Sequence, residues 1–158
     1  MVAVLDDKLA DLDRWIPGNR CSITRALDVV GTKTAMLILR ESMYGTTRFD
    51  GFARRVGVSD AVASARLKGL VDAGLLEKVP YQEPGQRTRH EYHLTEKGTD
   101  LMPVIFGLMQ WGDKYLQPEG HPLDLISDVT GEPVKAGLTT PDGNAVPLDE
   151  LRISLVKP

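Results

Sequence analysis

The chain has 158 residues, of which 42% are hydrophobic and 26% charged, as in an ordinary globular protein with one sizeable domain. Its first nineteen residues include four acidic ones where a signal peptide needs positive charge, and no apolar run approaches membrane-spanning length. The single cysteine excludes an internal disulfide and fits a reducing compartment. We therefore expect a cytoplasmic protein that makes no contact with a membrane.

The formal net charge of −3 is unevenly distributed along the chain. Residues 1–19 carry −2 and residues 95–158 carry −5, whereas residues 20–94 carry +4. A basic excess confined to one segment is the electrostatic footprint of nucleic-acid binding. The distribution therefore indicates a DNA-binding surface within residues 20–94.

Three helical patterns precede the basic centre of this segment. Residues 3–16 place apolar side chains on one side of a helix, which predicts an N-terminal helical arm over residues 1–19 that packs on its own domain or on a second subunit. Residues 21–30 predict a short helix with Ile23, Ala26, Leu27 and Val30 turned inward. Residues 33–43 are apolar on most sides, so we expect that helix at the centre of the core.

Residues 46–74, TTRFDGFARRVGVSDAVASARLKGLVDAG, predict two helices separated by a tight turn. The first starts near Arg48 and ends at Gly57, which can adopt a left-handed conformation. Ser59 can cap the second helix, and Ala63 begins its buried stripe. This pattern is a helix-turn-helix, whose second helix lies in the DNA major groove, although any pair of packed helices shares it.

Two alternating segments, residues 75–81 and 89–94, follow the second helix and predict a β-hairpin with a turn at Pro84-Gly85. The loop carries Arg87, and Arg89 follows it. A hairpin directly after a recognition helix is the wing of a winged helix, whose arginines can enter the minor groove or hold phosphates. A solvated basic loop is the alternative interpretation.

A long helix is predicted from the N-cap Thr95 to Leu116, with a bend near residues 99–103 because Pro103 interrupts the pattern. Its apolar face continues beyond the needs of one small domain, which indicates a dimerisation helix. Residues 117–158 contain short β-type runs between prolines and glycines, with a hairpin turn at 141–144. We therefore expect three parts: residues 1–19, a DNA-binding domain over residues 20–116, and a β-rich extension over residues 117–158.

Several segments together resemble the HxlR branch of the MarR-like winged-helix transcription regulators: CSITRALDVVGTK, LILRES, the helix-turn-helix, the arginine-bearing wing, YHLTEKG and LMPVIFGLMQWGDKYL. The resemblance covers roughly residues 20–116. It implies a mainly α fold with a small β-hairpin (α+β), and a homodimer that binds double-stranded DNA at a pseudo-palindromic operator. In some members of that family a cysteine near the position of Cys21 acts as a redox or electrophile switch.

The chain departs from the family pattern in three places. The family usually has a Trp shortly after Lys33, and the Thr34-Ala35 found here leaves space that a ligand could fill. Family members commonly carry longer polar or basic side chains near Ala61 and Ala65, whose methyl groups donate no hydrogen bond, so DNA shape can carry more of the specificity. The tail lacks the cysteine pairs of some relatives, which excludes a zinc knuckle there.

Other groups of residues give only weak evidence for a redox, metal or catalytic site. Cys21 lies near a helix start with Arg20 and Arg25 close by, an arrangement that favours a thiolate, but a small packing residue is the alternative. His90 and His93 point to opposite faces of a strand and cannot bind one metal ion. No phosphate loop or paired-carboxylate arrangement is present, so we expect neither an enzyme, nor a metal, nor a cofactor.

The sequence thus predicts a dimeric DNA-binding transcription regulator, most often a repressor in families of this kind, with a small-molecule or redox effector left open. The predicted DNA-binding residues are Arg48, Arg54, Arg55, Ser59, Ser64, Arg66, Lys68, Arg87 and Arg89. The alternative, motivated by Ala61 and Ala65, is a ligand or redox sensor or a protein-interaction module that keeps the fold and reads DNA weakly. The operator, the effector, the sign of regulation and the role of the tail cannot be derived from the sequence.

Overall fold

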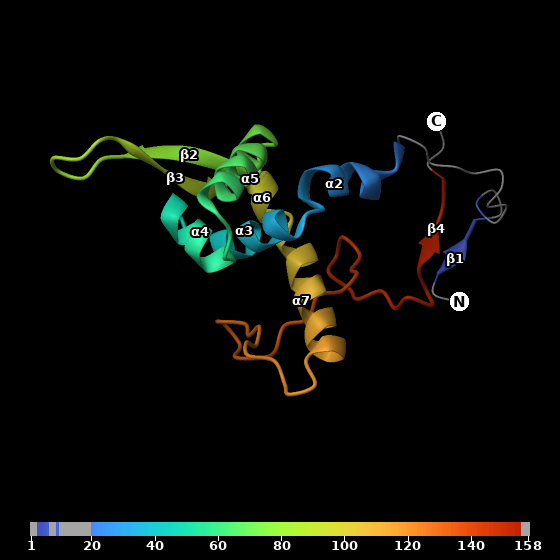
Figure 1. Ribbon diagram of the computed structural model, residues 1–158. Helices are drawn as coiled ribbons and strands as arrows, with labels where there is room; N and C mark the ends of the chain where they lie inside the picture. The colour runs from blue at the N-terminus through green and yellow to red at the C-terminus, as the bar shows by residue number, and fades with distance from the viewer. Residues whose placement is uncertain (1–2, 7–8, 10–19, 156–158) are drawn as a thin grey trace. The chain divides into compact units, whose positions relative to one another are not determined.

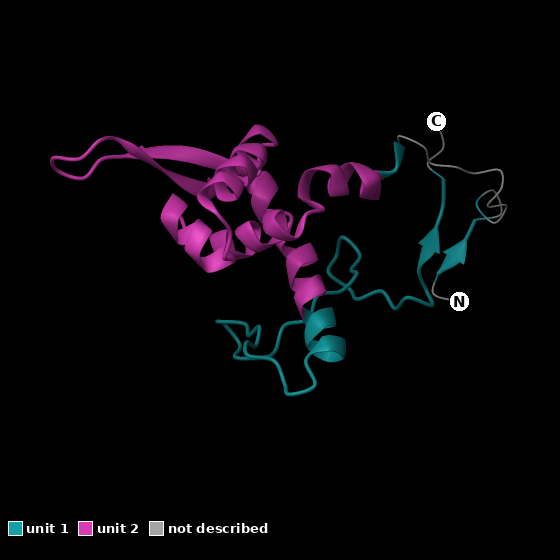
Figure 2. Ribbon diagram, in the orientation of Figure 1, with its two compact units in different colours: residues 1–21, 110–158 teal, residues 22–109 magenta. Residues whose placement is uncertain are grey.

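The computed structural model describes residues 3–6, 9 and 20–155, which belong to two compact units (Figures 1 and 2). One unit comprises residues 22–109, and the other comprises residues 1–21 together with 110–158. The sequence placed boundaries after residues 19 and 116. In the structure the second boundary falls inside the last helix, and the two ends of the chain share one unit.

The unit of residues 22–109 has the order of elements that the sequence predicted (Figure 1). The elements are α2 (Ser22–Val30), α3 (Lys33–Met43), α4 (Phe49–Val56), α5 (Asp60–Asp72), β2 (Leu76–Tyr81), β3 (Arg89–Leu94), α6 (Glu96–Thr99) and the first half of α7 (Met102–Leu116). The strands β2 and β3 pair antiparallel from Leu76↔Leu94 to Tyr81↔Arg89. This architecture is α+β, a winged helix-turn-helix.

The core of this unit is built around α3, as predicted. Its side chains Ile38 and Leu39 are fully buried, and they belong to one cluster with Phe52 of α4, Leu67 of α5 and Leu76 of β2. Each of these elements therefore turns one apolar stripe towards the same centre, which leaves the opposite face of α5 to solvent.

Local capping fixes the turn between α4 and α5. Gly57 adopts φ +72° and donates its backbone N–H to the carbonyl of Ala53, which closes α4. The Ser59 hydroxyl accepts a hydrogen bond from the Val62 N–H at 3.4 Å and caps α5. Both caps confirm the prediction, whereas the cap of α3 by Thr32, which accepts from the Ala35 N–H, was not foreseen.

The predicted inward face of α2 is wrong. Ile23 is 72% exposed and Leu27 is 58% exposed, and Ala26 is also exposed. Only the last residue of the helix, Val30, joins the core. The amphipathic pattern of α2 is real, but within the described residues its apolar face is left open to solvent.

The predicted helix from Thr95 to Leu116 is interrupted where its proline indicated a bend. Thr95 caps α6 by accepting from the Gly98 N–H at 3.1 Å, and α7 restarts at Met102. Pro103 lies in the first turn of α7, where a missing N–H costs no helical hydrogen bond.

The other unit pairs the two ends of the described chain. Strand β1 (Val4–Leu5) lies parallel to β4 (Arg152–Ile153), so a helix starting at residue 3 is wrong at these positions. The rest of that predicted helix, apart from Leu9, lies outside the described residues. In the tail the turn at 141–144 is confirmed by a bridge between Thr139 and Ala145, but regular strands are shorter than predicted.

Candidate nucleic-acid interface

The face of α5 that points away from the core is exposed along its length. Ala61, Ser64 and Ala65 are exposed there, as is Lys68 one turn further on. Lys68 forms an i,i+4 ion pair with Asp72, so part of its charge is neutralised within the helix. The face is therefore small and only weakly charged, as the sequence predicted.

Arg66 lies on the flank of this face and is half-buried. Its Nε atom is buried and has no hydrogen-bond partner among the described residues. A buried donor without an acceptor is costly, because its desolvation is not compensated. Arg66 is thus the residue of α5 with unused hydrogen-bonding capacity next to the exposed face.

The arginines of α4 have different surroundings. Arg54 is exposed. Arg55 donates from Nε to Glu41 of α3, whose side chain is only 3% exposed, and Arg40 donates to the other carboxylate oxygen of Glu41 at 2.6 Å. Burial raises the pKa of the Glu41 carboxyl, but the hydrogen bonds from Arg55 and Arg40 outweigh burial and hold the pKa below its usual value. Sequence analysis missed Glu41, although a glutamate in a nearly apolar helix was the available signal.

Arg48 precedes α4, and its side chain points to the wing. Its guanidinium contacts the carboxylates of Glu83 at 3.1 Å and Glu91 at 3.4 Å, and it lies 4.6 Å from the centre of the Tyr81 ring. The predicted DNA contact of Arg48 stays a prediction. The structure adds that two carboxylates of the wing already share this cation.

The wing carries its basic residues where the hairpin turns. Gly85 has φ +75°, and the Gln86 N–H donates to the Glu83 carbonyl at 3.0 Å, which confirms the turn at Pro84-Gly85. Arg87 and Arg89 are both exposed. The α5 face and the arginine-bearing wing of this unit are thus both exposed to solvent.

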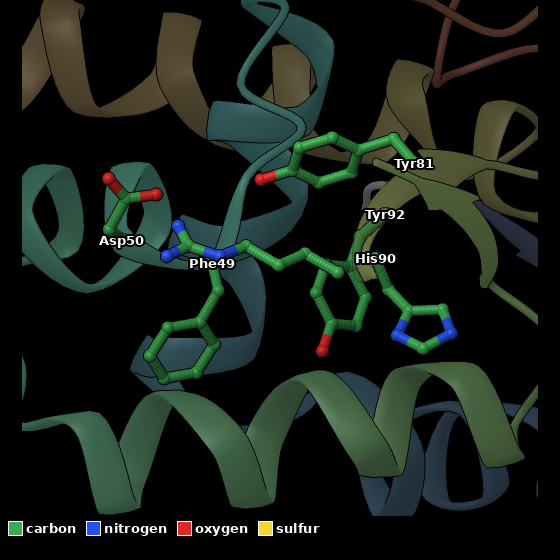
Figure 3. A pocket seen from close by; sticks show the side chains of 6 residues that line it. Phe49, Asp50, Tyr81, His90 and Tyr92 are labelled. Atoms are coloured by element: carbon green, nitrogen blue, oxygen red, sulfur yellow. The ribbon is translucent and has the colours of Figure 1, made fainter. Parts of the chain in front are cut away.

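A pocket of about 300 Å³ lies where the first turn of α4 meets the wing (Figure 3). The rings of Phe49, Tyr81 and Tyr92 line it, with Asp50 and His90 on opposite sides in this view. Arg89 completes its lining. The space predicted beside Thr34-Ala35 is at a different place from this pocket.

Cys21 lies at a helix start, as the sequence predicted, and His90 and His93 both lie on β3. Cys21 immediately precedes α2 and is half-buried. The His93 Nε2 atom lies 3.1 Å from a carboxylate oxygen of Glu91. Among the residues that the structure describes, no group of three His, Cys, Asp or Glu side chains could hold a metal ion, and no helix is long and apolar enough to cross a membrane.

Comparison with known proteins gives a family match over most of the helix-turn-helix unit. The model of the HxlR-like helix-turn-helix family matches residues 29–120. An uncharacterized HTH-type transcriptional regulator of Mycobacterium tuberculosis, Rv3095, is 45% identical over 125 residues, which are 78% of this chain and 77% of that protein.

Two solved structures are similar to this chain both in fold and in sequence. The putative transcription factor PA1607 has a TM-score of 0.73 and 33% identity, with 87% of this chain and 96% of that chain covered. The redox regulator HypR in its reduced form has a TM-score of 0.55 and 25% identity, with 60% of this chain and 93% of that chain covered. The likeness to HypR covers a share of this chain that is about the size of the winged helix-turn-helix. The likeness to PA1607 extends beyond that unit.

Proposed function

This chain belongs to the HxlR-like helix-turn-helix family and is a DNA-binding transcriptional regulator, and we propose that it acts as a homodimeric repressor on a pseudo-palindromic operator. The observation that carries the proposal is the joint exposure of the α5 face and the wing on one unit. In this arrangement α5 enters the major groove, and the wing reaches the adjacent backbone or minor groove.

The residues of the interface have separate roles in this proposal. Ser59, Ser64, Arg66 and Lys68 meet bases or nearby phosphates, and Ala61 and Ala65 touch thymine methyl groups. Arg54, Arg87 and Arg89 contact the DNA backbone, and Arg55 reaches it while holding Glu41. Since direct base contacts are few, DNA shape supplies much of the specificity.

Dimerisation is supported by the exposed apolar side chains of α7. Val104, Leu108, Trp111 and Tyr115 recur at spacings of four, three and four residues, and each is more than half exposed. Such a stripe covers one side of a helix and is expected to be buried by a partner. A second copy of the same helix is the partner we propose.

The test of this function is the stoichiometry of the complex with an operator duplex. Sedimentation equilibrium at saturation should give two chains per duplex. When the operator is placed over the promoter of a reporter gene, expression of that gene should fall as the concentration of the protein rises. One chain per duplex would overturn the dimeric arrangement, and increased expression would overturn repression.

A redox input is a second proposal, and it rests on Cys21. Its place directly before α2 brings the thiol close to the positive end of that helix, which favours the reactive thiolate. HypR, a neighbour in fold, is described as a redox regulator in reduced and oxidised forms. Cys21→Ser should abolish any loss of DNA binding caused by oxidation, and persistence of that loss in the variant would exclude Cys21 as the switch.

A further inference from the structure

We propose that Arg48 is a positioning residue that holds the wing in its DNA-binding orientation and screens two wing carboxylates from the DNA. This inference rests on the proposed DNA-binding function, and it assigns to Arg48 a task other than direct contact with phosphate. Its partners lie 33, 35 and 43 residues further along the chain, at Tyr81, Glu83 and Glu91.

The backbone around Arg48 already belongs to the base of the wing. Arg48 forms an antiparallel bridge with Glu91, and the Tyr92 N–H donates to the Thr47 carbonyl at 2.8 Å. Arg48 occupies the N-cap position of α4, but its side chain makes no capping hydrogen bond. The guanidinium is therefore available to the hairpin, and it reaches the hairpin at three points.

Each contact uses a different part of the guanidinium. Nη1 lies 3.1 Å from Glu83 Oε1, Nε lies 3.4 Å from Glu91 Oε1, and the planar group lies over the Tyr81 ring. A planar fork can bridge two carboxylates while it stacks on an aromatic ring, whereas the compact ammonium of a lysine cannot do all three.

The contact with Glu83 continues to the tip of the wing. The second carboxylate oxygen of Glu83 accepts from the Gln86 side chain at 3.1 Å, and the Glu83 carbonyl accepts from the Gln86 N–H. Gln86 immediately precedes Arg87, the arginine of the loop (Figure 1 shows the hairpin projecting from the helices). Arg48 is thereby connected through Glu83 and Gln86 to the residue that we expect on the DNA backbone.

Charge gives Arg48 a second effect. Glu83 and Glu91 would repel DNA phosphates if their charges were uncompensated, and their repulsion falls when a cation lies between them. The Glu91 pKa is lowered by the hydrogen bond from His93 and then by the one from Arg48, so its carboxylate stays ionised at neutral pH. Removing Arg48 would therefore both loosen the wing and uncover negative charge.

The first experiment is hydrogen–deuterium exchange on the DNA-free protein, which does not depend on the proposed function. Arg48→Ala should raise the exchange rate of the wing-loop amides by roughly threefold or more, because the lost contacts lower the cost of local opening. Arg54→Ala, in the last turn of α4 and exposed, is the matched control and should leave those rates unchanged. Unchanged wing exchange in Arg48→Ala would overturn the proposal, whether or not the protein binds DNA.

The second experiment is a double-mutant cycle measured by operator affinity at several salt concentrations. Arg48→Ala should weaken binding by roughly fivefold or more in the natural chain but much less in a Glu83→Gln/Glu91→Gln background, since residues of one network are coupled. Arg48→Lys should lose the wing contacts as Arg48→Ala does and recover only the part of the affinity that screening supplies, because it keeps the charge but not the bridge.

A direct phosphate contact gives the opposite results. Arg48→Lys would then keep most of the affinity, Arg48→Ala would cost as much in the Glu83→Gln/Glu91→Gln background, and the salt slope would fall by about one unit. That outcome would overturn the positioning role. If the natural chain bound no operator, the proposed function would fail, and the exchange experiment alone would decide whether Arg48 holds the wing.

Discussion

Glu41 is a carboxylate buried between α3 and α4, and its two arginine partners are the reason that it can be charged there. Arg40 and Arg55 remain partly solvated, with side-chain exposures of 35% and 49%. The ion pair therefore connects the core helix α3 to α4, the first helix of the helix-turn-helix. The cost of desolvating the two arginines is reduced, because both stay partly in contact with water. Arg55 is a structural residue in this respect, whatever contact it also makes with DNA.

Glu41→Gln should lower the free energy of unfolding at pH 7 by about 1–3 kcal/mol, because both arginines lose a charged acceptor. The folded pKa of Glu41 is below the unfolded value, so its contribution is present above the unfolded pKa and is lost as the pH falls through the folded pKa. The difference from the natural chain, measured by urea denaturation, should therefore shrink below about pH 4.5. Asp72→Asn, which breaks an exposed pair, is the control and should change stability by less than about 0.5 kcal/mol. A difference that is independent of pH would contradict this assignment.

Arg87 tests the contact of the wing with DNA at the level of one side chain. Arg87→Ala should weaken binding to all sequences alike and reduce the slope of log affinity against log salt by about one unit, because one phosphate contact is lost. Fluorescence anisotropy with operator and random duplexes measures both effects. An unchanged slope would remove Arg87 from the interface.

At the scale of elements, the sequence predicts the caps and the central position of α3, but it does not predict the long-range partners of individual side chains. Ser59, Thr95 and Gly57 could be assigned as caps because capping depends on residue type and position within one turn. The partners of Arg48 could not be assigned, because they come from distant residues of another element. The exposure of Ile23 was missed for a related reason, since an apolar stripe does not say whether its own domain covers it.

The backbone of α6 approaches the loop before β2 closely, and this tertiary contact also comes from residues distant in the sequence. Gly98 is buried, and a Cβ at this position would overlap the backbone carbonyl of Leu75. Gly69 lies on the exposed side of α5, where an added Cβ would meet nothing within 4 Å. A side chain at position 98 would therefore clash with the backbone, whereas a side chain at position 69 would have room.

Gly98→Ala should destabilise the protein by about 1–3 kcal/mol, because neither backbone can give way without moving an element. Gly69→Ala should instead stabilise it by about 0.5–1 kcal/mol through helix propensity. Thermal and urea denaturation of both variants measure the contrast. Equal effects of the two substitutions would contradict the close backbone approach at Gly98.

At the scale of the whole molecule, the exposed apolar residues of α7 form the surface on which we propose that a second copy packs. The sequence suggested a dimerisation helix from its length and from an apolar face that continues beyond one domain, and in the structure Val104, Leu108, Trp111 and Tyr115 of α7 are exposed. Leu108→Asp should convert the dimer to monomer and weaken operator binding, because a charge would be buried in the interface. Asp113→Lys, on the opposite side of the same helix, is the control for a charge change outside this stripe. Sedimentation velocity measures both, and a dimeric Leu108→Asp would place the interface elsewhere.

The central claim is that this chain reads DNA as a symmetric dimer, and selection of bound duplexes from a random pool at moderate salt tests it most directly. The reduced protein should enrich a two-fold symmetric site whose half-sites lie about one helical turn apart, because two recognition helices occupy successive major grooves. Repeating the selection with oxidised protein should remove the site if Cys21 is the switch. Failure of the reduced protein to enrich any sequence would contradict the claim and favour the sensor or interaction module.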